Sequence, residues 1–163
     1  MDPSDERTTG RVPTEWRRDG YTISTDRARI DVDLVHGFLT ASYWAEGIPR
    51  DVVERSVAHS LCFGLYEGDR QIGLARVITD HATFAYLSDV FVLERCRGRG
   101  LASWMLEVIH AHPSLQGLRW WLLATRDAHA LYQRAGYAAL AAPERLMERR
   151  FPDAYRLPDP GRR

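Results

Sequence analysis

The chain has 163 residues, 45% hydrophobic and 27% charged, a length and composition that fit one globular domain with a sizeable core. Acidic and basic residues balance at 22 each, and a net charge of zero argues against nucleic acid and against an anionic membrane as partners. Because every basic residue is arginine, the chain has no lysine for a P-loop or a Schiff base, which excludes both kinds of chemistry.

Two further features predict a soluble, cytoplasmic protein. Cys62 and Cys96 are the only thiols and do not form a C-x-x-C pair, so neither a disulfide framework nor a metal site is indicated. No apolar run approaches the ~20 residues that a membrane span needs, and the N-terminal segment has no apolar signal core.

The ends of the chain predict no packed structure. Residues 1–19 are charged and lack an apolar period, so we expect a flexible N-terminal lead. Residues 152–163 are rich in proline and glycine and predict a loosely held tail. The folded domain is therefore expected over residues 20–151.

The domain begins with one strand and two helices. Residues 21–24 predict the strand, and a four-residue apolar period from Ile30 predicts a helix capped at residues 25–26. An aromatic linker follows at residues 42–48. Pro49 is then placed to open a second helix.

Three successive strands are predicted next. Residues 61–67 and 71–79 flank Gly68-Asp69-Arg70, which is a hairpin turn signal, and residues 82–93 follow after a short polar turn. We expect an antiparallel meander.

The second half of the chain predicts alternating helices and strands. Residues 100–112 form an amphipathic helix, and the apolar run 118–124 predicts a strand covered on both faces. Strand-helix-strand order makes this strand parallel to the last strand of the meander. A short helix is expected within residues 127–136, before a closing hairpin formed by residues 137–140 and 146–151.

The loop before residue 101 suits a phosphate group. It opens a helix, whose first N–H groups lack intrahelical partners and whose dipole favours negative charge. Gly98 and Gly100 let the backbone approach closely, while Arg95, Arg97 and Arg99 add fixed positive charge. The sequence therefore predicts a diphosphate cradle.

Two motifs resemble those of the GCN5-related N-acetyltransferases, the GNAT family. Arg97-Gly98-Arg99-Gly100-Leu101-Ala102 fits the family's acyl-CoA pyrophosphate motif, and residues 124–137 fit its strand-to-helix segment. The resemblance covers residues 21–151. It implies an α+β (mixed α/β) fold: a central, mostly antiparallel twisted sheet of about seven strands with a splayed parallel pair, flanked by about four helices.

The resemblance also implies where the cofactor binds. The pantetheine arm would enter between the two parallel strands, with the acetyl carbonyl near the amides of Phe91 and Val92, which could stabilise charge on that oxygen. Asp127 stands where the family more often has an asparagine that contacts the cofactor; as aspartate it could instead cap the short helix.

Direct acyl transfer to an amine needs a base for the amine and an acid for the departing thiolate. Tyr132 stands at the position that the family often uses for the acid, and its alternative is an ordinary core-edge aromatic. Asp89 lies near the position of a family carboxylate that receives the amine proton directly or through water. A solvated or arginine-paired side chain is the other interpretation of Asp89.

The aromatic linker is the candidate acceptor site. Tyr43, Trp44 and Glu46 would serve a cationic amine with aromatic faces and one carboxylate, and Glu46 competes with Asp89 as the base. A surface loop packed by its own aromatics is the alternative.

These features predict an acyl-CoA-dependent acetyltransferase that moves an acetyl group from acetyl-CoA to a primary amine of a small molecule. A non-catalytic acyl-CoA-binding sensor or interaction module, and a protein or peptide N-acetyltransferase, are the alternatives. The expected partners are acetyl-CoA and the amine, without nucleic acid, membrane or metal, in a monomer or a homodimer.

Overall fold

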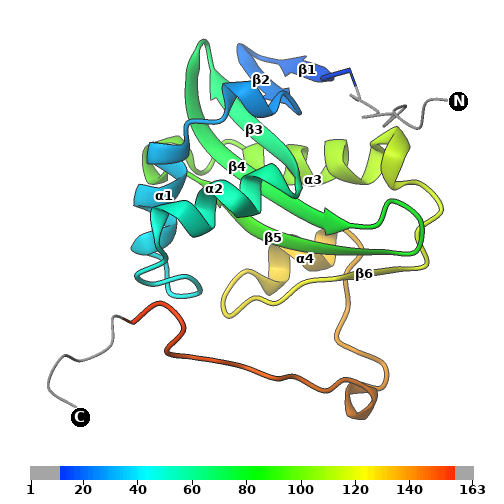
Figure 1. The fold of residues 1–163 in the computed structure, drawn as a ribbon. Coiled ribbons are helices and arrows are strands. Elements are labelled where there is room, and N and C mark those ends of the chain that lie inside the picture. The colour runs from blue at the N-terminus through cyan, green and yellow to red at the C-terminus, as the bar shows by residue number, and fades with distance from the viewer. Residues whose placement is uncertain (1–11, 157–163) are drawn as a thin grey trace, which may run out of the picture.

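One mixed sheet forms the centre of the structure, a computed structural model that describes residues 12–156 (Figure 1). Its strands lie side by side in chain order, and only the last pair is parallel. The strands are β1 (Glu15–Arg18), β2 (Tyr21–Ser24), β3 (Leu61–Glu67), β4 (Arg70–Thr79), β5 (Phe84–Val92) and β6 (Trp120–Leu122). The predicted fold class is confirmed, with six strands in the described part of the chain where about seven were expected.

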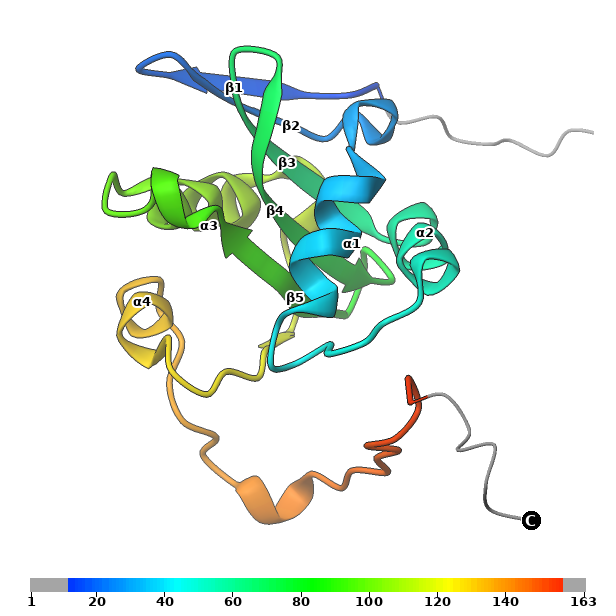
Figure 2. The same ribbon diagram turned by 90° about the vertical axis from the view of Figure 1, so that its left-hand side faces the viewer.

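Helices cover both faces of this sheet (Figure 2). They are α1 (Val32–Thr40), α2 (Arg50–Ala58), α3 (Leu101–Ala111) and α4 (His129–Arg134), with single 3-10 turns at η1 (Arg27–Arg29), η2 (Glu94–Cys96), η3 (Pro113–Leu115) and η4 (Pro143–Arg145). The sheet separates two groups of buried side chains. We call them the α3-side core, which includes Met105 of α3, and the α1/α2-side core, which includes Val35 of α1 and Val53 of α2.

The first predicted helix begins later than expected. Asp26 caps η1 by accepting a hydrogen bond from the N–H two residues later, and Asp31 then caps α1 by accepting from the N–H three residues later. Two capping aspartates so close together start two helical segments in place of one. The second segment, α1, buries Val35 and Leu39. The apolar stripe that was predicted to start at Ile30 therefore lies at the edge of the buried face of α1 and not at its centre.

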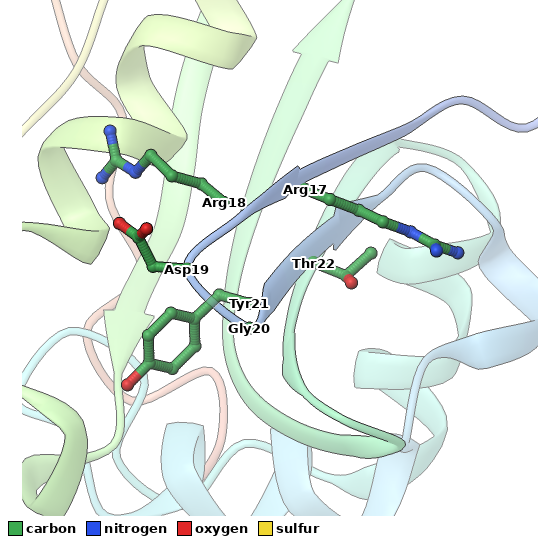
Figure 3. A pocket seen from close by; sticks show the side chains of 6 residues that line it. All are labelled: Arg17, Arg18, Asp19, Gly20, Tyr21 and Thr22. Carbon is green, nitrogen blue, oxygen red and sulfur yellow. The ribbon is translucent and has the colours of Figure 1, made fainter.

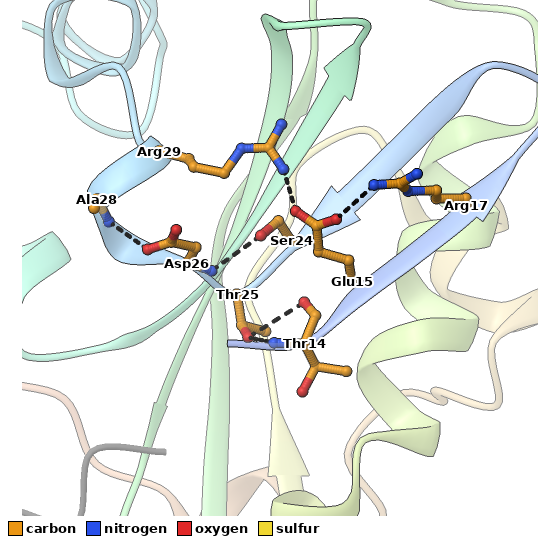
Figure 4. Close-up of polar contacts among 8 residues, drawn as sticks. All are labelled: Thr14, Glu15, Arg17, Ser24, Thr25, Asp26, Ala28 and Arg29. Atoms are coloured by element: carbon orange, nitrogen blue, oxygen red, sulfur yellow. Dashed lines mark hydrogen bonds and ion pairs between the residues drawn. The ribbon is translucent and has the colours of Figure 1, made fainter. Parts of the chain in front are cut away.

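Residues 15–18, predicted to belong to the flexible lead, form the edge strand β1. Glu15 pairs in register with Ser24 of β2, and the Thr14 N–H donates to Thr25 Oγ1 at 2.9 Å (Figure 4). Glu15 also accepts hydrogen bonds from Arg17 and Arg29. These contacts cover the edge of β2, while residues 1–11 of the predicted lead lie outside the described residues.

A bulge interrupts β5 where it passes β4. Leu74 faces Phe91 and Arg76 faces Ser88, so Asp89 and Val90 together oppose one residue of β4. Asp89 takes the left-handed conformation, with φ of 50°. The extra residue reverses the alternation of side chains. Leu87 lies in the α3-side core before the bulge, whereas after it the odd-numbered Phe91 lies in the α1/α2-side core.

The predicted closing hairpin is wrong. No strand occurs in residues 137–140 or 146–151, and this part of the chain extends away from the sheet (Figures 1 and 2). Pro143 opens η4 in the middle of the segment, and Glu148, Arg149 and Arg150 interrupt the apolar pattern that a covered strand needs. β6 is also shorter than the predicted strand at residues 118–124.

Candidate active site

The two parallel strands separate at the middle of β5. Their pairing ends at Tyr86 opposite Leu122, although β5 continues to Val92. Residues 87–92 therefore have no strand beside them on the β6 side in the described structure. This open edge is the gap that the sequence predicted for a pantetheine arm.

The two predicted amide donors on β5 point in opposite directions. The Leu93 N–H donates to the carbonyl of Ile72 at 2.8 Å, so strand alternation turns the N–H of Val92 away from β4 and that of Phe91 toward it. The Val92 carbonyl points to the same side as the Val92 N–H, because it accepts a hydrogen bond from Arg97 Nε at 3.0 Å on the open side. Val92 is therefore better placed than Phe91 to bind a ligand through its main chain.

The predicted phosphate loop is folded as a cradle at the start of α3. Gly98 and Gly100 have φ values of 75° and 73°, and Gly100 takes the N-cap position of α3 without any side-chain cap. Both conformations favour glycine, and the first N–H groups of the helix face outward unpaired by a cap. A cavity of about 200 Å³ lies here, lined by the end of β5, this loop, the first turn of α3 from Leu101 to Ser103, and Leu131 and Arg134 of α4.

Arg134 is a site residue that sequence reasoning missed. It follows Leu131 by three residues on α4, so both side chains share the helix face that lines the cavity. That spacing was the available signal. Arg134 brings a second arginine, from α4, to the cavity that Arg97 also lines.

The three arginines of the loop are not equivalent. Arg97 holds the loop against the end of β5, as described above. Arg99 instead donates to the Tyr21 hydroxyl at 2.6 Å and lies 3.6 Å from Glu67, so it ties the cradle to the neighbouring strands. Arg95 is exposed. Arg97 and Arg134 are therefore the cations that line the cavity.

A hollow of about 380 Å³ lies near the Tyr21 end of this contact (Figure 3). It is lined by consecutive residues of the β1–β2 turn, from Arg17 to Thr22. Asp19 and Gly20 at its tip have φ values of 52° and 83°, typical of a tight hairpin turn. One turn forms the whole hollow, and no second element brings functional groups into it, so we do not place the site there.

The linker between α1 and α2 bridges the two sides of the gap. Trp44 Nε1 donates to Asp89 Oδ1 of β5 at 3.1 Å, and the Tyr43 hydroxyl accepts from the Arg126 N–H at 3.0 Å in the segment after β6. The Arg126 guanidinium also stacks 3.8 Å above the Tyr43 ring. Glu46 lies exposed on the same loop. We call residues 42–48 the acceptor loop.

Asp89 is paired with an arginine, which was one of the two interpretations left open. Its Oδ2 accepts from Arg76 Nε at 2.7 Å, and the Asp89 side chain is only 8% exposed. Arg76 is itself held by Ser60 Oγ at 2.9 Å and Ser88 Oγ at 3.3 Å. One oxygen of the carboxylate is therefore held by Arg76, while Oδ1 is bonded to Trp44 of the acceptor loop.

Tyr132 lies on α4, on the opposite side of the gap from Asp89. Burial raises the pKa of its phenol to about 12, and the nearby Tyr43 and Asp127 raise it further. Its ring meets Tyr137 edge-on at 5.9 Å. Tyr132 is consequently protonated at neutral pH and has a proton to donate.

The prediction that Asp127 caps α4 is wrong. The N-cap is Ala128, whose N–H donates to Thr125 Oγ1 at 3.1 Å, while Asp127 lies exposed and 3.9 Å from Arg126. The helix starts one residue later than predicted, which moves Asp127 off the capping position. Its other predicted role, in cofactor binding, stays a prediction.

The site thus combines a glycine-lined cavity at a helix start, an opened pair of parallel strands, a phenol on one side and a carboxylate on the other. Such a set fits a group-transfer enzyme that uses a phosphate-bearing donor. No helix within residues 12–156 has both the length and the apolar character needed to cross a bilayer.

Comparisons with known proteins agree with this class. Residues 58–139 match the family model described as the acetyltransferase (GNAT) domain. A Gibberella zeae protein named as an acetyltransferase is 35% identical over an alignment of 143 positions, and the match covers 74% of this chain and 80% of that protein.

Solved structures give the same result. A GNAT-family acetyltransferase from Xanthomonas campestris pv. campestris is 46% identical, with a TM-score of 0.83 over 86% of this chain and all of that one. An acetyltransferase from Clostridium acetobutylicum, solved with acetyl-CoA, is 14% identical with a TM-score of 0.57, covering 85% of this chain and 96% of that one, and it shares the fold. The chain belongs to the GCN5-related N-acetyltransferase family and is an acyl-CoA-dependent acetyltransferase.

Proposed function

We propose that this enzyme transfers the acetyl group of acetyl-CoA to the primary amine of a small molecule. The observation that carries the proposal is the acceptor loop, which reaches across the gap from Asp89 to Arg126. This loop places the rings of Tyr43 and Trp44 next to each other, with Trp44 bonded to the Asp89 carboxylate. These features suit a compact cation better than an extended peptide.

The cosubstrate would bind at the two places already described. Its diphosphate would lie in the cavity at the start of α3, against the glycine backbone, Arg97 and Arg134. The pantetheine arm would run along the open edge of β5, where the Val92 N–H is available to the thioester oxygen, whereas the Phe91 N–H points toward β4. The thioester carbon would then face the acceptor loop.

The acceptor amine would approach from the side of Asp89. Oδ1 accepts only the indole N–H of Trp44, so an ammonium group could replace that weak donor and be oriented by the carboxylate. After losing a proton, to Asp89 directly or through water, the nitrogen attacks the thioester carbon. Glu46 stays the alternative base, since it lies exposed on the same loop.

The departing thiolate needs a proton as the carbon–sulfur bond breaks. Tyr132 is our proposed donor, because it is protonated at neutral pH and lies beside the cavity-lining face of α4. The products are the acetylated amine and the free thiol of CoA.

The direct test is a spectrophotometric assay of CoA-thiol release with acetyl-CoA and a panel of amines, polyamines, amino acids, aminoglycosides and peptides. We expect release with small amines and little with peptides. A peptide preference would favour protein acetylation. Thermal stabilisation by acetyl-CoA without thiol release from any acceptor would favour a sensor.

A further inference from the structure

Arg126 is a cation at the acceptor loop that the proposed reaction leaves without a role. Its main-chain N–H donates to the Tyr43 hydroxyl at 3.0 Å, and its guanidinium lies 3.8 Å above the Tyr43 ring. The loop after α1 and the segment between β6 and α4 meet at this contact (Figures 1 and 2). Because both the main chain and the side chain of Arg126 are held by Tyr43, little side-chain freedom is left to lose when a ligand binds.

The guanidinium of Arg126 has unused hydrogen-bond donors. Stacking occupies its flat face, so the N–H groups along its edge stay available for a planar anion such as a carboxylate. Within the described residues this guanidinium donates no hydrogen bond, and the carboxylate nearest to it is that of Asp127 at 3.9 Å. The two side chains are 67% and 65% exposed, and an exposed pair at that distance contributes little.

The proposed cofactor cavity has other arginines. Arg97 and Arg134 line the cavity at the start of α3, and Arg126 does not belong to that lining. Arg126 is tied to the acceptor loop instead. An anion bound at Arg126 would therefore belong to the acceptor and not to the diphosphate of the cofactor.

The site for the ammonium group lies one residue further along the acceptor loop. Trp44 Nε1 donates to Asp89 Oδ1 at 3.1 Å, and the Trp44 ring meets the Tyr43 ring edge-on with centroids 5.1 Å apart. Arg76 balances the charge of Asp89 through the other oxygen, so this pair offers an acceptor to one ammonium but no net negative charge to a polycation. Glu46 is the remaining acid of the loop, and no contact with another described residue orients its exposed carboxylate.

We propose that the acceptor is a zwitterionic amine, whose ammonium binds at Asp89 and whose carboxylate binds at Arg126. This inference rests on the proposed transfer to a small primary amine and names the class of that amine. The ammonium replaces the indole N–H at Oδ1, and the carboxylate accepts hydrogen bonds from the edge of the guanidinium. After the ammonium loses a proton, its nitrogen bonds to the thioester carbon, the carbon–sulfur bond breaks, and the sulfur leaves as the protonated thiol of CoA. The carboxylate of the acceptor is unchanged.

The first test compares three acceptors of equal chain length that differ at one end. γ-Aminobutyrate ends in a carboxylate, n-butylamine in a methyl group and putrescine in a second ammonium. From CoA-thiol release, we expect kcat/KM for γ-aminobutyrate to exceed that for n-butylamine about 10-fold or more, the typical strength of a hydrogen bond to a charged group. Putrescine should react least. The same comparison with shorter and longer chains finds the length that best spans Asp89 and Arg126.

Two negative results have different meanings. If the amines react but the carboxylate gives no preference at any chain length, the inference is overturned and the proposed transfer to a small amine stands. If no small amine of any kind releases CoA thiol, the proposed function fails, and the inference fails with it.

Substitutions at Arg126 supply the second test. In Arg126→Gln the ratio of kcat/KM for γ-aminobutyrate to that for n-butylamine should fall toward one, and in Arg126→Glu putrescine should become the better substrate of the charged pair. Each ratio is taken within one variant, so a partial loss of folded enzyme cancels. Arg70→Glu is the matched control, because Arg70 is exposed at the start of β4 and should keep the original preference.

Two outcomes in these variants would overturn the inference. One is a preference that survives both substitutions at Arg126. The other is weaker binding of acetyl-CoA to Arg126→Gln in calorimetry without an acceptor, which would assign Arg126 to the cofactor.

Discussion

Trp44 Nε1 and Asp89 Oδ1 are joined by a 3.1 Å hydrogen bond that ties the acceptor loop to the bulge of β5. The other oxygen of Asp89 is bound to Arg76 at 2.7 Å, so the carboxylate has one firmly held side and one side with a replaceable neutral donor. In the proposed reaction, an arriving amine would meet a carboxylate that is already oriented. The acceptor loop would release its indole as the amine takes that place.

Asp89→Asn tests the role of this carboxylate. Asparagine tolerates the left-handed backbone at this position, so the bulge should persist while the charge is lost. We expect kcat/KM for the amine to fall about 10-fold or more, a loss of ~1.4 kcal/mol of transition-state stabilisation, with acetyl-CoA affinity unchanged. Steady-state kinetics and calorimetry measure both quantities. Asp127→Asn, at an exposed carboxylate beside Arg126, is the control. Equal kinetics for the two variants would move the base assignment to Glu46.

Tyr132→Phe tests the proposed acid. Removing the hydroxyl takes away the proton for the thiolate, and general acid catalysis typically contributes roughly 10²- to 10⁴-fold, so turnover should fall severalfold at least. The dissociation constant for acetyl-CoA should not change. Tyr137→Phe is the matched control for Tyr132→Phe, because burial also raises the pKa of Tyr137 and its ring packs against that of Tyr132. Unchanged turnover in Tyr132→Phe would refute the assignment.

The pH dependence of stability can be tested at His110. Burial lowers the pKa of this imidazole below its usual value of 6.5, while the unfolded chain keeps the usual value. The unfolded state therefore binds more protons near and below pH 6.5. The contribution of neutral His110 to the free energy of unfolding is present above pH 6.5 and is lost as the pH falls from 6.5 toward the lower pKa of the folded state. Melting temperatures at pH 7.5 and pH 5 should differ less in His110→Gln than in the unmodified protein. His59→Gln, at an exposed histidine, is expected to keep the full difference.

Gly100→Trp tests the cradle. Gly100 has a φ of 73° and open space around the position of a Cβ, so a tryptophan there would fill the approach to the first turn of α3. We expect acetyl-CoA binding to be lost. Gly117→Trp has nearly the same backbone, a φ of 75° with equally open space, but lies outside the cavity. Both variants place a side chain on a left-handed backbone, at a cost of roughly 1–2 kcal/mol. Calorimetry should therefore show a difference in acetyl-CoA binding between the two variants and no difference in their stability. Tight binding in Gly100→Trp would refute the cradle.

The sequence predicted most of the fold because its signals are local. Pro49 opens α2, the turn at residues 68–70 joins two strands, and Gly100 precedes α3, as expected from turn and capping chemistry. The predicted closing hairpin is absent, since residues 137–151 contain no strand. An apolar pattern in a segment does not say which edge of the sheet the segment will reach. β1 was missed because four residues are too few to show a period.

The parts of the candidate site that lie within one sequence motif were predicted. The contacts between segments that are distant in the sequence were missed. Gly98 and Gly100 line a cavity at the start of α3, where the motif predicted a cradle, and their binding of a diphosphate stays a prediction. The Asp89–Arg76 pair, in contrast, joins two strands whose register includes the bulge. One signal was available: Arg76 is a charged residue within the apolar strand 71–79, and such a residue requires a buried partner. The roles of Tyr132 and Asp89 remain predictions that the variants above examine.

The bulge at Asp89 adds one residue to β5 without moving the residues that follow it along β4. Phe91 lies opposite Leu74 and Val92 opposite Gly73, so deleting one of the two bulged residues would restore regular pairing and leave the Val92 N–H on its open side. The same deletion would change the backbone that carries the Asp89 carboxylate. Relatives that lack the extra residue should therefore keep the main-chain donor and differ in how they present a carboxylate.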